Sequence, residues 1–175
     1  MDAKGKSEPN RTKNPTTVER TSEREVVTTR TFNGPVRIVF AAWTRPELLK
    51  QWWAPTSFGV TFMSCEADVR TGGTYRFVFG HPASEQPMAF FGRYLEVTPN
   101  ARLVWTNDEG GEGGAVTTVT FEERGADTLV VMRDLYPSKE ALDEAIASGS
   151  MGGYDETFAQ LDDLLVTLGA SSGRP

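Results

Sequence analysis

The chain has 175 residues, of which 38% are hydrophobic and 24% are charged, and its formal net charge at pH 7 is −6. This size and composition are typical of one soluble globular domain with a sizeable core, and the acidic balance disfavours binding to nucleic acid phosphates. The single cysteine, Cys65, excludes an intramolecular disulfide and fits a reducing cytoplasm, and no apolar run is long enough to predict a membrane span or a signal peptide.

Both ends of the chain are predicted to be disordered tails, over residues 1–22 and 170–175, around one domain at 23–169. Residues 1–22 contain Val18 as their only branched aliphatic side chain. Such a segment buries too little apolar surface to offset the entropy lost on ordering.

The domain begins with a β-rich segment, "REVVTTRTF" (24–32), which predicts a strand. The sequence "VRIVFAAW" (36–43) follows a turn, and its apolar residues recur three and four positions apart. That spacing favours a short helix.

A second short helix is expected to begin near Pro46 and to run through the tryptophan pair at 52–53, where Pro55 ends it. Thr44 and Glu47 form a Thr-x-x-Glu pattern that is typical of a capping box at such a helix start. Because neighbouring helical residues point about 100° apart, one tryptophan should pack in the core and the other should lie towards a cavity or its rim.

Strands dominate the middle of the chain. Within 74–80, Tyr75, Phe77 and Phe79 alternate with Arg76 and Val78, so the three aromatic residues share one face. Turn residues separate the later strands in pairs and predict two hairpins. The expected strands are 60–70, 74–80, 88–97, 102–108, 115–123 and 128–136.

Two helices are expected after the strands. Ser138 is a suitable cap for a helix at 139–148 that Gly149 ends, and this helix is a candidate lid over a cavity. The last segment, 154–168, carries one apolar stripe at Tyr154, Phe158, Leu161, Leu165 and Leu168, with Asp155, Glu156, Asp162 and Asp163 off it. The predicted fold is therefore α+β, with six or seven antiparallel strands curved around a long C-terminal helix and a cavity between them.

Four segments carry a family resemblance: "WTRPELLKQWWAP", "EADVRTGGTYRF", "FFGRYLEVTPNARLVWT" and "GGYDETFAQLDDLL". They resemble, in order and spacing, the family named after the activator of the ninety-kilodalton heat-shock chaperone's ATPase, within the START-like (SRPBCC) superfamily. The resemblance covers residues 25–168 and implies the helix-grip fold.

The resemblance leaves the function open. Relatives in the superfamily bind lipids, sterols or polyketides between helix and sheet, so a bulky apolar or amphipathic ligand is the first expectation. A module that binds a chaperone and stimulates its ATPase is the second, and an enzyme of cyclase or hydrolase type is the third. The resemblance also leaves a homodimer open.

Metal and nucleophile chemistry have little support in the sequence. His81 is the only histidine and stands in a polar loop, "GHPASEQP", and no carboxylate cluster with ligand spacing accompanies it or Cys65. The glycines of "TGGTY" and "GGEGG" lack the lysine and hydroxyl residue of a phosphate-binding loop. We therefore expect no metal, no cofactor and no catalytic residue.

Charged residues within strands are the more informative polar signal. Glu66, Asp68 and Arg70 alternate and are read as an outer-face ladder. Arg133 and Asp134 are adjacent in a strand, so one of them is expected to face the concave side, where it would orient a polar ligand group or act in acid–base chemistry. The predicted cavity residues are Trp53, Phe58, Tyr75, Phe77, Phe79, Phe91, Trp105, Met132, Arg133 and Phe158, although a register step of one would exchange the strand faces.

Overall fold

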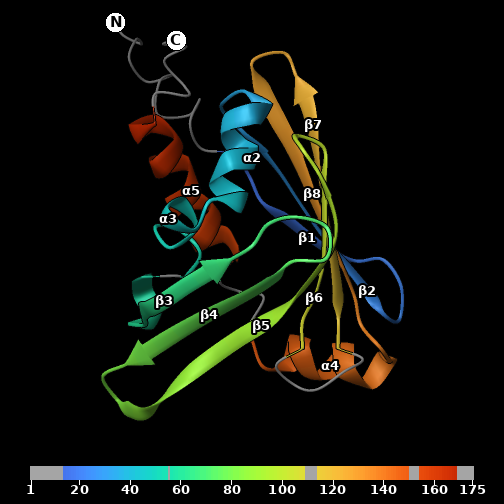
Figure 1. Ribbon diagram of the computed structural model, residues 1–175. Helices are drawn as coiled ribbons and strands as arrows, with labels where there is room; N and C mark the ends of the chain where they lie inside the picture. Colours follow the sequence, from blue (N-terminus) through green and yellow to red (C-terminus); the bar gives the residue numbers. More distant parts are fainter. Residues whose placement is uncertain (1–13, 55, 109–113, 150–153, 169–175) are drawn as a thin grey trace, which may run out of the picture.

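The computed structural model of the protein describes residues 14–54, 56–108, 114–149 and 154–168. Its strands form one antiparallel sheet of eight strands in the order β1-β2-β8-β7-β6-β5-β4-β3. The helices α2 and α5 lie side by side on one side of this curved sheet (Figure 1). The α+β architecture predicted from the sequence is confirmed, with one strand more than the six or seven expected.

The chain crosses from β2 to the opposite edge of the sheet through α2, α3 and a 3-10 turn, η2, and then returns strand by strand until β8 pairs with β2. The elements are β1 (Thr17–Arg20), β2 (Glu25–Phe32), α2 (Val36–Thr44), α3 (Pro46–Leu49), η2 (Thr56–Phe58), β3 (Thr61–Ala67), β4 (Thr74–His81), β5 (Ser84–Thr98), β6 (Arg102–Thr106), β7 (Val116–Arg124), β8 (Asp127–Leu135), α4 (Lys139–Ala147) and α5 (Tyr154–Thr167).

The additional strand is β1, which lies inside the segment predicted to be a tail. It pairs with β2 from Thr17 opposite Thr29 to Arg20 opposite Val26, while all four of its side chains are exposed. Backbone hydrogen bonds to β2 hold this edge strand. They need no apolar side chains, so the sequence shows no pattern that predicts the strand. Residues 1–13 and 169–175 lie outside the described residues, and the tails predicted there stay predictions.

The helix α3 is shorter than the sequence predicts. It ends at Leu49, and the tryptophan pair follows in a turn in which the N–H groups of Trp52 and Trp53 both donate to the carbonyl of Leu49, at 3.2 and 3.0 Å. The expected capping box is also wrong, because the Thr44 hydroxyl donates to the carbonyl of Phe40 at 2.9 Å. Thr44 is the last residue of α2, where its side chain bonds backwards along its own helix.

The apolar stripe of α5 packs on the sheet as predicted at Phe158, Leu161 and Leu165, which are all buried. Asp162 departs from the prediction, because it is buried as well and forms an ion pair with Arg30 of β2. The guanidinium of Arg30 also lies 3.3 Å from Asp155. The pair fixes α5 on β2, since a buried charge is tolerated only beside its partner.

The sheet bends sharply along the 15-residue strand β5, so that β3, β4 and the first part of β5 extend away from the other strands (Figure 1). The register with β6 shifts by one residue at Leu95, between Tyr94 and Glu96. At Gly92 a Cβ atom would lie 2.1 Å from the carbonyl oxygen of Thr106. The missing side chain and the bulge let the backbones approach and the strand bend.

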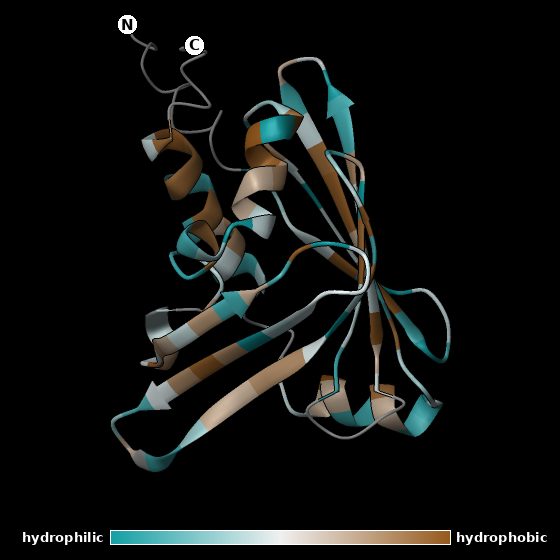
Figure 2. Ribbon diagram, in the orientation of Figure 1, coloured by the Kyte–Doolittle hydropathy of each residue, from teal (hydrophilic) through white to brown (hydrophobic). Residues whose placement is uncertain are grey.

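The core lies between the sheet and the helices α2 and α5. Figure 2 shows long hydrophobic stretches in α5 and β8. No helix in the described part of the chain combines the length and the hydropathy needed to cross a membrane.

Candidate functional site

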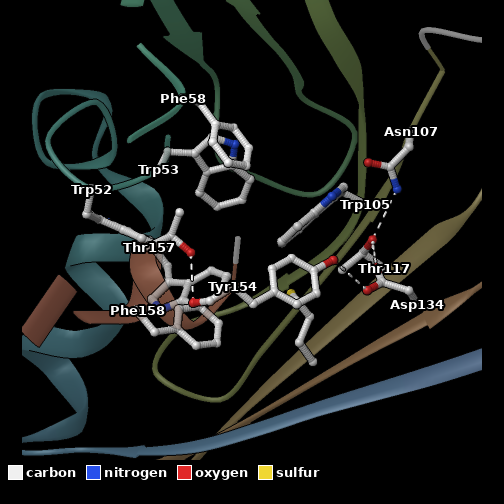
Figure 3. Close-up of a pocket in the computed structure, with 12 residues that line it drawn as sticks. Trp52, Trp53, Phe58, Trp105, Asn107, Thr117, Asp134, Tyr154, Thr157 and Phe158 are labelled. Atoms are coloured by element: carbon white, nitrogen blue, oxygen red, sulfur yellow. Dashed lines mark hydrogen bonds between the residues drawn. The ribbon is translucent and has the colours of Figure 1, made fainter. Parts of the chain in front are cut away.

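A cavity of about 220 Å³ lies between α5, the tryptophan turn and the concave side of the sheet. Its wall has an aromatic end and a polar end (Figure 3). The residues that line it are Trp43, Trp52, Trp53, Phe58, Trp105, Asn107, Thr117, Met132, Asp134, Tyr154, Thr157 and Phe158.

The aromatic end contains all four tryptophans of the chain. Trp43 comes from α2, Trp52 and Trp53 come from the turn after α3, and Trp105 comes from β6. The ring centroid of Trp43 lies 4.9 Å from that of Trp52, 6.0 Å from that of Trp53 and 6.5 Å from that of Trp105. Edge-on and tilted contacts of this kind stabilise aromatic clusters beyond the area that they bury.

The two adjacent tryptophans divide their roles as the sequence predicts, although they lie in a turn. Trp52 is 1% exposed, and its indole N–H donates to the carbonyl of Ala42 at 2.9 Å. Trp53 is only half-buried, and its ring centroid lies 5.6 Å from that of Phe77 and 6.2 Å from that of Trp105. Trp52 is therefore part of the core, and Trp53 is a wall of the cavity.

Two polar side chains of α5 hold this turn in place. The amide of Gln160 donates to the carbonyls of Trp52 and Ala54, at 3.1 and 2.9 Å, and accepts from the N–H of Thr56 at 2.9 Å. The carboxylate of Glu156 accepts from the N–H of Ser57 at 2.9 Å. These bonds pin both ends of the segment that carries Trp53 and Phe58.

The polar end is built around Asp134, on β8, which is 6% exposed. One carboxyl oxygen accepts from the hydroxyl of Thr117 at 2.6 Å, and the other lies 3.5 Å from the hydroxyl of Tyr154. The side-chain amide of Asn107 donates to Thr117 at 3.1 Å (Figure 3). Thr117 and Asp134 are directly opposite each other on β7 and β8, which explains their close approach.

Burial raises the pKa of Asp134 to about 6, although the hydrogen bonds from Thr117 and Tyr154 oppose the shift. Burial, together with the nearby Asp134 charge, also raises the pKa of Tyr154 well above its ordinary value. At neutral pH the site therefore presents a carboxylate that is easily protonated beside a neutral phenol. Such a group can accept a hydrogen bond from a ligand, pair with a positive charge or exchange a proton.

The structure brings five of the ten predicted residues into this cavity: Trp53, Phe58, Trp105, Met132 and Phe158. Phe58 is 49% exposed and lies at its rim. Three others face the same side of the sheet but lie beside the cavity. Tyr75 and Phe77 line a small void with Trp53 and Trp105, and Phe79 lines a second cavity of about 200 Å³ with Phe90, which shares Trp53 and Phe58 with the first.

Arg133 and Phe91 do not lie in the cavity. Arg133 is exposed on the outer face, where its guanidinium lies 3.6 Å from Glu25, so that Asp134 is the inward member of that pair. Phe91 is 36% exposed and stands opposite Arg76, whereas its neighbour Phe90 is opposite Phe77. The error is a choice of strand face, which alternation alone leaves undetermined.

Sequence reasoning did not place seven of the lining residues there: Trp43, Trp52, Asn107, Thr117, Asp134, Tyr154 and Thr157. A signal existed for two of them. Asp134 was recognised as one of two alternatives, and Tyr154 begins the apolar stripe of the last helix. No sequence pattern predicts that Asn107 and Thr117 line the cavity, because their place in it depends on how the strands pair.

The other candidate groups lie elsewhere. His81 is the last residue of β4 rather than part of a loop, and its Nδ1 atom accepts from the N–H of Ala83 at 2.9 Å. Burial raises the pKa of Cys65 to about 11, and its thiol donates to the carbonyl of Pro46 at 3.6 Å. Among the described residues, no three His, Cys, Asp or Glu side chains group in a way that could hold a metal ion.

The helix α4 does not cover this cavity, since none of its described residues lines it. Its Leu142 is buried, and its Asp143 forms an ion pair with Arg20 of β1 at 2.8 Å. The lid predicted for residues 139–148 is therefore wrong for this cavity. The glycines at 110–113 and 152–153 lie outside the described residues.

Comparison with known proteins gives a family and a fold. The family described as Activator of Hsp90 ATPase homolog 1-like protein matches residues 33–166. A search of curated proteins found no match.

Similar solved structures come from several bacteria. A crystal structure from Rhodobacter sphaeroides is 23% identical, with a TM-score of 0.80 over 88% of this chain and 99% of that chain. A solution structure from Staphylococcus epidermidis is 26% identical, with a TM-score of 0.74, and the match covers 87% of this chain and 94% of that chain. An AHSA1-like protein from Aeromonas hydrophila is 15% identical, with a TM-score of 0.65, and the match covers 85% of this chain and 98% of that chain.

Proposed function

The chain belongs to the family of Activator of Hsp90 ATPase homolog 1-like proteins, and from this premise we propose that it binds a small, largely apolar molecule in the cavity between α5 and the sheet. One observation carries the proposal: the cavity is lined by seven aromatic side chains and by a single cluster of polar groups at one end. Apolar walls with a few converging polar groups are typical of small-molecule sites.

The volume restricts the size of the ligand. An apolar cavity of about 150 Å³ holds a benzene molecule, so 220 Å³ suits a compact ligand of one or two rings. A longer lipid-like or polyketide-like molecule would need the second cavity too. That cavity adds about 200 Å³ and adjoins the first at Trp53 and Phe58, so a rotation of these two side chains would join the two spaces.

Affinity for such a ligand would come from buried apolar surface, at about 25 cal/mol per Å². The hydrogen bonds of Gln160 and Glu156 hold the wall in place before the ligand arrives, which reduces the entropy lost on binding. We propose binding without a reaction, and the described lining residues include no Cys, His, Ser or Lys.

The test is a thermal-shift screen of single-ring, fused-ring and lipid-like compounds, with native mass spectrometry of the purified protein. We expect compact aromatic compounds to raise the melting temperature of the wild type but not of Trp53→Ala. The matched control is Phe91→Ala, which removes an aromatic ring from the outer face. If no compound stabilises the wild type and no molecule copurifies with it, the proposed function is wrong.

A further inference from the structure

The cavity contains one charged group among its described residues, and that group is Asp134. It is 6% exposed, and it forms no ion pair with any residue in the described part of the chain. The charged residue beside it in sequence, Arg133, lies on the outer face of the sheet with Glu25. The protein thus buries a carboxyl group, and none of the described residues places a cation next to it.

The two oxygens of this carboxyl group differ. Oδ1 accepts a short hydrogen bond of 2.6 Å from Thr117. Oδ2 lies 3.5 Å from the Tyr154 hydroxyl, which is longer than a well-formed O–H···O bond. Oδ2 is therefore able to accept a second and better donor.

Aromatic rings line most of the cavity that Asp134 borders. Tyr154 points its hydroxyl towards Asp134 (Figure 3). The ring of Trp105 lines the same cavity, and its centroid lies 6.2 Å from that of Trp53. The faces of such rings carry negative charge and attract cations, most strongly where water is excluded. A carboxylate and several ring faces in one cavity select the same kind of ligand group.

We propose that the ligand is an organic cation, an amine with a compact apolar body, whose N–H group donates to Oδ2 of Asp134 while its body lies among Trp53, Trp105 and Tyr154. This inference rests on the proposed binding function and adds the chemical class of the ligand.

Charge argues against the alternatives. An anionic ligand such as a fatty acid would bring a second negative charge to Asp134, inside a protein whose net charge is already −6. A neutral alcohol would satisfy the hydrogen bond but would leave the carboxylate without a counter-ion. The negative protein also attracts a cation from solution.

The test compares three probes of nearly equal size by calorimetry at pH 7.5: 2-phenylethylamine, 2-phenylethanol and 3-phenylpropanoate. We expect the amine to bind about tenfold more tightly than the alcohol, and the propanoate to bind weakest. In Asp134→Asn the amine should lose this advantage, while the alcohol should bind as before. Asp163→Asn is the matched control, because it removes one exposed carboxylate from α5 and changes the net charge equally.

The outcomes separate the inference from the proposed function. If amine and alcohol bind the wild type equally, or if Asp134→Asn keeps the preference for the amine, the organic-cation inference is wrong and the proposed cavity stands. If none of the three probes binds, the organic-cation inference is wrong, and the compound screen with native mass spectrometry decides the proposed function.

A measurement on the wild type covers the case in which Asp134→Asn does not fold. Burial raises the pKa of Asp134 to about 6, so amine affinity should fall as the pH is lowered through 6, and alcohol affinity should not. The groups around Asp134 are Tyr154 of α5, Tyr136 after β8, and the outer-face pair Arg133–Glu25. The pKa values of both tyrosines are raised, that of Tyr136 to about 12. An amine affinity that stays constant from pH 7.5 to pH 5 would also overturn the inference.

Discussion

The helix α5 meets the sheet in two different ways along its length. At Leu161, Leu164 and Leu165 it is packed, and a buried aspartate, Asp162, is paired with Arg30. At Tyr154, Thr157 and Phe158 it borders a cavity, and the buried aspartate there, Asp134 of β8, has no cation beside it among the described residues. We call these the packed segment and the hollow segment of the α5–sheet interface.

The contrast shows that one interface can treat a buried carboxyl group in two ways. In the packed segment the charge of Asp162 is compensated inside the protein, so that the pair can fix the helix to β2. In the hollow segment no cation among the described residues compensates the charge of Asp134, which lines the cavity. That arrangement costs stability, and a buried carboxyl group with a raised pKa is typical of functional sites.

The largest expected effect comes from the tryptophan pair, which stands between the two segments. Trp52→Ala should lower the free energy of unfolding by about 3–5 kcal/mol, because a fully buried aromatic side chain leaves a cavity that cannot collapse. Trp53→Ala should cost clearly less, since Trp53 is half-buried, but it should abolish stabilisation by ligands. Chemical denaturation of both variants measures the difference, and equal losses would contradict the division of roles.

The packed segment is tested by breaking its ion pair. Arg30→Met should cost about 3 kcal/mol, because it leaves the buried Asp162 without its cation. The double change Arg30→Met with Asp162→Leu should recover most of this loss, since no charge is then buried. Arg133→Met is the control on the exposed face and should change stability by less than about 1 kcal/mol. A double variant as unstable as Arg30→Met would show that the charge is not the cause.

The hollow segment should show the opposite dependence on pH from a salt-bridged aspartate. Because the pKa of Asp134 is raised to about 6 in the folded protein from an ordinary value of 3.8, the folded state binds more protons than the unfolded state between these values. The ionisation of Asp134 therefore costs no stability at pH values below 3.8. The cost grows as the pH rises towards 6 and reaches about 3 kcal/mol at pH 7. Asp134→Asn should remove this loss and raise stability at pH 7. Melting curves from pH 4 to 7.5 measure it, and a less stable Asp134→Asn protein at pH 7 would contradict the expectation.

The smallest effect concerns the bonds that join the tryptophan turn to α5. Gln160→Ala should cost about 1 kcal/mol of stability, since it removes hydrogen bonds to Trp52, Ala54 and Thr56. It should also weaken ligand binding, because Trp53 is then held less firmly. Gln51→Ala removes an exposed glutamine of the same region and should leave binding unchanged. Equal binding by the two variants would show that the turn needs no support from α5.

Much of the architecture follows from local patterns. The alternation of Tyr75, Phe77 and Phe79 predicted a strand with one buried face, and all three are buried. Ser138 caps its helix as expected, accepting from the N–H of Ala141 at 3.1 Å. The stripe of the last helix predicted its contact with the sheet. These features depend on neighbours within about four residues, so the sequence contains them directly.

The site depended on longer-range contacts. Because side chains alternate along a strand, the members of each pair, Arg133 and Asp134 or Phe90 and Phe91, must point to opposite faces. Which member points inward is set by the register with the partner strands. One-residue shifts at Phe62/Ser64 and Tyr94/Glu96 move the alternation along the strands.

The sequence by itself determined most of the helices and strands, the apolar stripe of α5 and the family to which the chain belongs. The tertiary structure alone decided that four tryptophans from three elements meet, that Asp162 pairs with Arg30, and that Asp134 has no cation beside it among the described residues. The physical reason is that burial and charge compensation depend on which distant residues become neighbours, and strand pairing and helix docking settle that only when the whole chain folds.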